Sequence, residues 1–185
     1  MTSRGLAIRV AFAVAAFTLG GSARAADSPD TATVLGKLHH SNQMEVAAGK
    51  LAEEKGQSKE VKSFGKTLVT DHTASDKKVM ALAKSEKIEL PAEAAKPDDD
   101  KMMDKLKSAS GAEFDKTFAK DMLADHEKDI AEVKEARDKT TDTKLKSLLS
   151  ATLPVLEKHR DLAQKLVDKG ASASASGTNA APAKK

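Results

Sequence analysis

The sequence predicts an all-α protein: a four-helix bundle with a short extra helix in the connection between its second and third long helices. Four long stretches carry apolar residues at helical spacing. Ala, Lys, Glu, Asp and Leu dominate, Trp and Tyr are missing, and the alternating polar and apolar runs typical of strands do not occur. Residues 26–185 have the length of a single domain.

Residues 1–25 are expected to be a signal peptide rather than part of the fold. Arg4 and Arg9 flank the start of an apolar run over residues 10–19, and Ala23-Arg24-Ala25 offers small residues at the two positions that signal peptidase reads. The run is shorter than the roughly 20 residues that span a bilayer, so an uncleaved membrane anchor is the weaker alternative. We therefore predict export to the periplasm or outer envelope of a bacterium, with no integral membrane insertion of the mature chain.

The charge balance of the mature chain argues against nucleic acid as a partner. Three of the 31 Lys and Arg residues lie within residues 1–25, so the remainder equal the 28 acidic residues in number. A neutral chain without Trp or Tyr is a poor match for a polyanion. The absence of Cys excludes disulfides, thiolate ligands, a thiol nucleophile and a lipid anchor on the mature chain.

The first two long helices are predicted to form an antiparallel hairpin. Ser28-Pro29-Asp30 supplies an N-cap, a proline at the first helical position and an acid in the first turn. Gly56 ends the first helix, Ser58 can cap the second, and Pro91 follows the end of the second. The connection between these helices is only a few residues long, which favours antiparallel packing.

A loop and a short helix lead to the second hairpin. Residues 91–100 are rich in Pro, Ala and Asp, and the acidic residues 98–100 precede a helical pattern with Met102, Met103 and Leu106. These acids lack the spacing of a calcium loop, so N-capping is the better interpretation. About ten extended residues cover roughly 33 Å, which favours a crossover along the bundle over a simple up-down order.

The second hairpin begins at Ser110, which forms a capping-box pattern with Glu113. Residues 139–142 form a second short connection, and Gly170 is expected to end the fourth long helix. The bundle domain is therefore predicted over residues 28–169. Residues 170–185 are rich in Ala and Ser and are predicted to be a disordered tail.

One polar residue stands near the middle of each long helix, in line with the apolar positions: Asn42, His72, His126 and His159. A position at mid-height stays there whichever way a helix runs, so these side chains should meet in one layer of the core. Glu45 lies one turn from Asn42, at the edge of the same face. Asp71 and Asp125 precede two of the histidines and lie about 100° around their helices, at the flanks of the core.

This layer has two interpretations. The functional one is a transition-metal site formed by the three histidines together with Glu45, with Asp71 and Asp125 as further candidate ligands. The structural one, favoured from the sequence alone, is a polar core layer of Asn42 and the histidines that sets the register between helices. A carboxylate-bridged di-iron centre needs Glu-x-x-His on two helices, and no Glu in this chain stands three positions before a His.

No catalytic residue and no cofactor is predicted, apart from a possible transition metal ion. The chain has neither a G-x-S-x-G nucleophile motif nor a phosphate-binding glycine loop. The pairs Asp71-His72 and Asp125-His126 look like catalytic dyads as written. Adjacent helical residues do not face each other, however, so neither Asp can orient the His beside it.

Several motifs, in this order along the chain, resemble the bacterial family called domain of unknown function 4142. The matching residues are Asn42-x-x-Glu45, Gly49-x-Leu51-Ala52, Val61-Lys62-x-Phe64, Leu68-Val69-x-Asp71-His72-Thr73, Gly111-Ala112-x-Phe114-Asp115, Met122-Leu123-x-Asp125-His126-Glu127 and Thr152-Leu153-Pro154-x-Leu156-x-x-His159. The resemblance covers about residues 30–167. It implies a ferritin-like bundle in the periplasm or outer envelope and no particular activity, because the family is named for lacking one.

From these observations we predict an exported, non-enzymatic bundle protein with a binding or stress-protective role. No partner is predicted beyond a possible homo-oligomer. The alternative function is a metal-binding or oxidoreductase bundle that uses Glu45, His72, His126 and His159.

Overall fold

The computed structural model describes residues 28–90 and 97–177, which form α-helices and no strand. The helices are α1 (Thr31–Lys55), α2 (Lys59–Ser85), α3 (Pro97–Ser108), α4 (Gly111–Lys139) and α5 (Thr143–Gly177). The all-α prediction is confirmed, and α3 is the short extra helix expected before the second hairpin. The predicted signal peptide and residues 178–185 of the predicted tail lie outside the described residues. None of the described helices is both long and apolar enough to cross a membrane.

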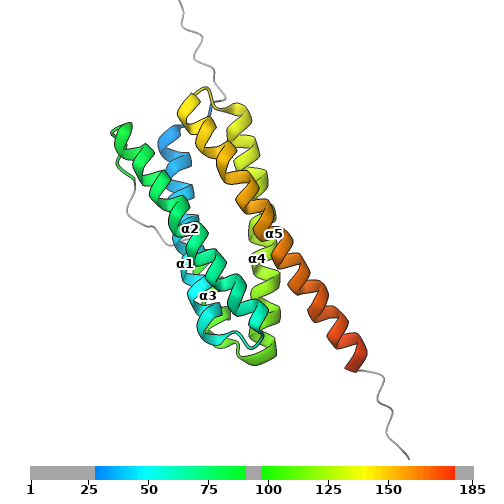
Figure 1. The fold of residues 1–185 in the computed structure, drawn as a ribbon. Coiled ribbons are helices and arrows are strands. Elements are labelled where there is room, and N and C mark those ends of the chain that lie inside the picture. The colour runs from blue at the N-terminus through cyan, green and yellow to red at the C-terminus, as the bar shows by residue number, and fades with distance from the viewer. Residues whose placement is uncertain (1–27, 91–96, 178–185) are drawn as a thin grey trace, which may run out of the picture.

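The long helices pack as two hairpins, α1 with α2 and α4 with α5, which lie side by side (Figure 1). The hairpins contact each other mainly through α2 and α5, whereas α1 and α4 are less closely packed. Gln57, between α1 and α2, donates its backbone N–H to Asp115 near the start of α4 (2.8 Å). Thr31, at the start of α1, donates its hydroxyl to Asp142 between α4 and α5 (3.1 Å). The helices α2 and α4 therefore begin at the same end of the molecule and run parallel.

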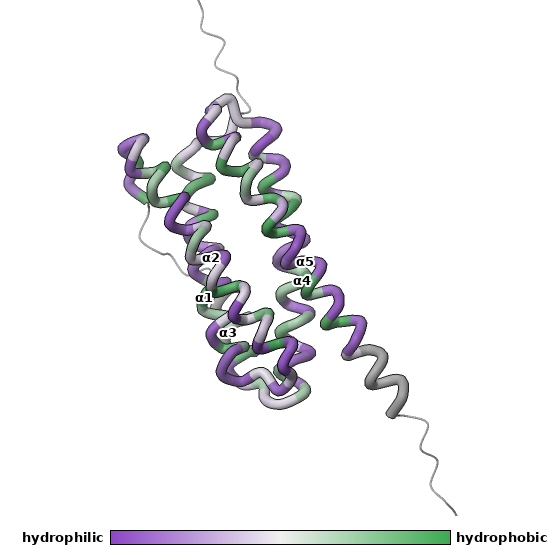
Figure 2. Tube along the Cα trace, in the orientation of Figure 1, coloured by the Kyte–Doolittle hydropathy of each residue, from purple (hydrophilic) through white to green (hydrophobic). Residues whose placement is uncertain are grey.

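The core consists of two apolar clusters, and the histidine layer lies between them. Along α2, His72 stands between Leu68 of one cluster and Val79 of the other. Along α4, His126 stands in the same way between Met122 and Ile130. Hydrophobic and hydrophilic positions alternate along each helix in Figure 2. Each of the long helices thus buries one face, and the polar layer interrupts that face at mid-height.

Two helix boundaries differ from the prediction. Asp30 caps α1, because its carboxylate accepts the backbone N–H of Thr33 (3.0 Å); the predicted cap, Ser28, precedes this position. At the other end of the fold, α5 continues past Gly170, the predicted end, to Gly177. The residues after Gly170 alternate between Ala and Ser, and the strong helix propensity of Ala supports this extension.

The start of α4 follows Ser110 as predicted, but the predicted capping box is wrong because the Ser110 side chain makes no capping hydrogen bond. Gly111 has a φ of 56°, so the chain enters the helix through a left-handed residue, a conformation that glycine adopts without strain. At this end of α4, the carboxylate that makes structural hydrogen bonds is that of Asp115. It accepts the backbone N–H groups of Gln57 and Ser58, both at 2.8 Å, and so ties α4 to the turn of the first hairpin.

Replacement of Asp115 by Ala should lower the free energy of unfolding by about 1–3 kcal/mol, because two backbone N–H groups lose a charged acceptor. Glu113→Ala is the matched control: Glu113 is exposed and makes no cap, so we expect a change below about 0.5 kcal/mol. Urea unfolding of both variants measures the difference. Equal losses would show that the Asp115 contacts do not hold the hairpins together.

Candidate metal centre

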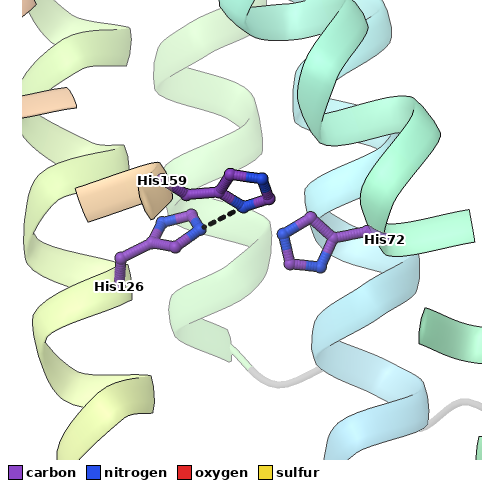
Figure 3. Close-up of side chains that lie close together, drawn as sticks. All are labelled: His72, His126 and His159. Atoms are coloured by element: carbon purple, nitrogen blue, oxygen red, sulfur yellow. Dashed lines mark hydrogen bonds between the residues drawn. The ribbon is translucent and has the colours of Figure 1, made fainter. Parts of the chain in front are cut away.

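Three histidines from three helices meet in the middle of the core: His72 of α2, His126 of α4 and His159 of α5. Each is at most 3% exposed. Their rings face one another, and one nitrogen of His72 points toward the other two rings (Figure 3). His126 Nε2 lies 3.3 Å from His159 Nδ1. One nitrogen from each ring lies within 4.8 Å of the nitrogens from the other two.

Each ring is held on its outer side by a hydrogen-bond acceptor. The pairs are His159 Nε2 with Asp71 Oδ2 at 2.9 Å, His126 Nδ1 with the Met122 carbonyl oxygen at 2.8 Å, and His72 Nδ1 with Asn42 Oδ1 at 3.0 Å. Because all three partners are acceptors, we assign the ring protons to these outer nitrogens. This assignment leaves a lone pair on the inner nitrogen of each neutral ring.

The pKa shifts keep all three rings neutral at pH 7. Burial, followed by the proximity of the other two histidines, lowers the pKa of His72 to about 3. Burial also lowers the pKa of His126 to about 4. It lowers the pKa of His159 as well, although the hydrogen bond to Asp71 offsets part of that shift. Neutral imidazole is the form that binds metal ions.

The inner lone pairs have no proton to share. A hydrogen bond between His126 Nε2 and His159 Nδ1 would require a second proton on one of these rings, which the lowered pKa values disfavour. His72 Nε2 is buried and has no hydrogen-bond partner in the described part of the chain. Lone pairs left unsatisfied in an apolar core are costly. A single bound cation would satisfy all three.

The spacing of two of the three rings fits a tetrahedral metal ion. At Zn–N distances of about 2.0–2.1 Å, two ligand nitrogens of a tetrahedron lie about 3.3–3.4 Å apart. The distance between His126 Nε2 and His159 Nδ1 is 3.3 Å. Metal-bound histidines usually donate their other N–H to a carboxylate or a carbonyl, and Asp71, Met122 and Asn42 supply such acceptors here. The three histidines therefore fit a metal ion together with the groups that would orient them.

Glu45, Asp71 and Asp125, the carboxylates proposed as ligands from the sequence, are not part of this group. Within residues 28–90 and 97–177, the three histidines form the one group with metal-ligand spacing. Glu45 Oε1 lies 3.6 Å from His126 Nδ1, the outer nitrogen of that ring. Burial, and then the charges of Asp125 and Asp129, raise the pKa of Glu45 well above its usual value. Asp125 lines a cavity between α1 and α4.

Asp71 supports a different histidine from the one beside it. It precedes His72 on α2 but accepts a hydrogen bond from His159 of α5. Burial raises the pKa of Asp71, but hydrogen bonds from His159 and Lys158 outweigh it, so the pKa is lowered and the carboxylate stays ionised. Its place at the flank of the core, at the height of the histidine layer, is the signal that could have revealed this pairing. The Met122 carbonyl group could not be found in this way, because every residue has a backbone carbonyl group.

Acid should destabilise the metal-free protein through these histidines. Their pKa is near 6.5 in the unfolded chain and falls to about 3 for His72 and about 4 for His126 in the folded protein. Between these values the unfolded state binds more protons, so stability is fully present above pH 6.5 and is lost as the pH falls. Each of the two histidines contributes about 2.5 kcal/mol, so we expect a loss of about 5 kcal/mol by pH 4.5.

Urea unfolding of chelator-treated protein at pH 7.5, 5.5 and 4.5 measures this loss. Other carboxylates also titrate in this range, so the control is His72→Leu, which should lose clearly less stability over the same interval. Parallel curves for the two proteins would contradict the prediction.

Comparison with known proteins identifies the family of the chain. A family model described as "Domain of unknown function (DUF4142)" matches residues 17–166. The match covers most of the chain, so the protein belongs to this family, and the resemblance seen in the sequence is confirmed. No curated protein and no solved structure shows a significant match. Family membership carries no activity, so the function has to be argued from the histidine site.

Proposed function

We propose that this member of the DUF4142 family is an exported metal-binding protein that holds one transition-metal ion between His72, His126 and His159. The observation that carries the proposal is the convergence of three buried ring nitrogens whose opposite N–H groups already have acceptors. A purely structural polar layer would instead pair donors with acceptors across the layer. The basic and apolar character of residues 1–25 supports export.

The helix arrangement supports the same proposal. The two hairpins and the parallel course of α2 and α4 favour a four-helix bundle with ferritin-like helix order. Bundles of this kind build metal sites from side chains that face each other at mid-height. This site differs from a di-iron centre because its ligand group contains imidazoles and no carboxylate. A set of three imidazoles suits Zn²⁺ or copper.

The burial of the rings favours metal binding over catalysis. Each ring is at most 3% exposed, so a substrate would have no direct access to an ion bound between them. Catalytic metal sites keep a coordination position that substrate or water can reach. We therefore favour binding or sequestration of a metal ion over an oxidoreductase function.

The test is a titration of chelator-treated protein with Co²⁺ and Zn²⁺. We expect one ion per chain and the visible absorption of tetrahedral Co²⁺, and we expect His72→Ala, His126→Ala and His159→Ala each to abolish binding. The control is His39→Ala, because His39 contacts Asp76 and Gln43 outside the site. Absence of binding, or binding that survives all three substitutions, would refute the proposal.

Asp71→Ala should weaken metal binding by about 10- to 100-fold, because His159 loses the acceptor that orients its ring. Asp125→Ala is the matched control: each Asp precedes a histidine of the site, but Asp71 is the one that accepts a ring N–H of the layer. Competition against a chelator of known affinity measures both. A similar loss in the two variants would mean that only general negative charge near the site matters.

A further inference from the structure

A cavity of about 500 Å³ lies between α1 and α4, where the two hairpins are less closely packed. Val34, Leu38, Val133 and Leu149 line part of it, and three of these four are themselves members of the apolar core cluster on that side of the histidine layer. Core side chains therefore form a wall of the cavity. Concave sites of this size are typical of small-molecule binding.

The polar lining includes a buried carboxyl group. Glu45 lines the cavity and is 5% exposed, and its Oε2 is buried without a hydrogen-bond partner in the described part of the chain. Asp125 and Asp129 line the cavity close to it: after burial, their charges are the main causes of the raised pKa of Glu45. Ser41 donates a hydrogen bond to Asp129 (2.7 Å). Two carboxyl groups thus lie near a buried one whose Oε2 has no hydrogen-bond partner among the described residues.

Lysines form ion pairs with Glu132 and Glu135, two further acidic residues of the lining. Lys37 and Lys128 lie 4.0 and 3.9 Å from Glu132, and Lys139 lies 2.8 Å from Glu135. These groups are largely exposed and form ion pairs with one another. The lining therefore combines ion pairs at its exposed part with an acidic region that consists of Glu45, Asp125 and Asp129. Such a distribution is complementary to a ligand that is apolar along its body and positively charged at one end.

We propose that this cavity binds a small apolar molecule with a single cationic head group, such as a primary amine. The head group lies against the acidic region around Glu45, and the apolar body lies against Val34, Leu38 and Leu149. A second metal ion is a poorer occupant, because the carboxylates of the cavity do not form a group with metal-ligand spacing. None of the three histidines of the metal centre lines the cavity, so this inference does not depend on the proposed metal site.

A series of three probes of equal length and different charge tests the proposal: 4-phenylbutylamine, 4-phenylbutan-1-ol and 4-phenylbutanoate. Titrations followed by ¹H–¹⁵N NMR give the affinity of each probe and locate the residues that respond. We expect the amine to bind about tenfold or more tightly than the alcohol and the acid. The shifts should centre on α1 and α4 beside Val34, Leu38 and Val133.

Because a bound ammonium group favours the ionised form of Glu45, Glu45→Gln should remove the preference for the amine and leave weak binding of the alcohol unchanged. Glu53→Gln is the matched control, because Glu53 is an exposed residue of the same helix, and it should keep the preference. If Glu45→Gln does not fold, as judged by its NMR spectrum, Asp125→Asn should still reduce the preference by about threefold or more. Equal affinity for amine and alcohol, amine binding outside the cavity, or an undiminished preference in these variants would overturn the proposal.

Discussion

Addition of Zn²⁺ to the metal-free protein should raise its free energy of unfolding by about 3–4 kcal/mol when the free ion exceeds its Kd by roughly 100- to 1,000-fold. The effect is large because the metal-free core contains three lone pairs without donors, and the ion both satisfies them and links α2, α4 and α5. For a domain of this size, the melting temperature should rise by about 10 °C. Thermal and urea unfolding with and without the ion measure the change.

The contrast with His126→Leu separates a metal site from a structural polar layer. Without metal, this variant should stay folded with little or no loss of stability, because an apolar side chain replaces a buried polar one of similar size. It should also gain nothing from Zn²⁺. A wild-type protein whose stability does not change with Zn²⁺, together with a His126→Leu variant that keeps its stability, would favour the structural interpretation of the layer.

The histidine layer could be predicted from the sequence because height and facing direction are properties of single helices. Helix caps determine where the middle of each helix lies, and the 3.6-residue period determines which side chains face the core. His72, His126 and His159 satisfy both conditions, and their rings do converge. The sequence alone favoured a structural layer over a metal site, and it does not show how the rings are oriented.

What the sequence did not reveal depends on relations between helices. The hydrogen bond from His159 to Asp71 joins α5 to α2, and it requires knowing which helices are neighbours and how each is rotated. The same holds for the cavity beside Glu45. This cavity exists because α1 packs less closely against α4 than against α2. The missing cap at Ser110 coincides with a left-handed Gly111, a backbone conformation that the capping-box pattern of the sequence does not reveal.

Gly65→Ala should lower the free energy of unfolding by about 2–4 kcal/mol, although Ala is intrinsically better than Gly inside a helix by about 1 kcal/mol. The reason is the close approach of α1 and α2. A Cβ at Gly65 would lie 2.6 Å from the carbonyl oxygen of Gly49 and 2.8 Å from the Cβ of Ala52. Backbone cannot move aside as a flexible side chain can, so the two helices would have to separate.

Gly170→Ala is the matched control for this effect, because a Cβ at Gly170 would meet nothing within 4 Å. Here helix propensity acts alone, and stability should rise by up to about 1 kcal/mol. Urea unfolding of the two variants should therefore give changes of opposite sign, and a Gly65→Ala variant as stable as the wild type would contradict the close-packing argument. Separation of α1 from α2 would also pull Asn42 from His72, so the metal affinity of Gly65→Ala should fall while that of Gly170→Ala is unchanged.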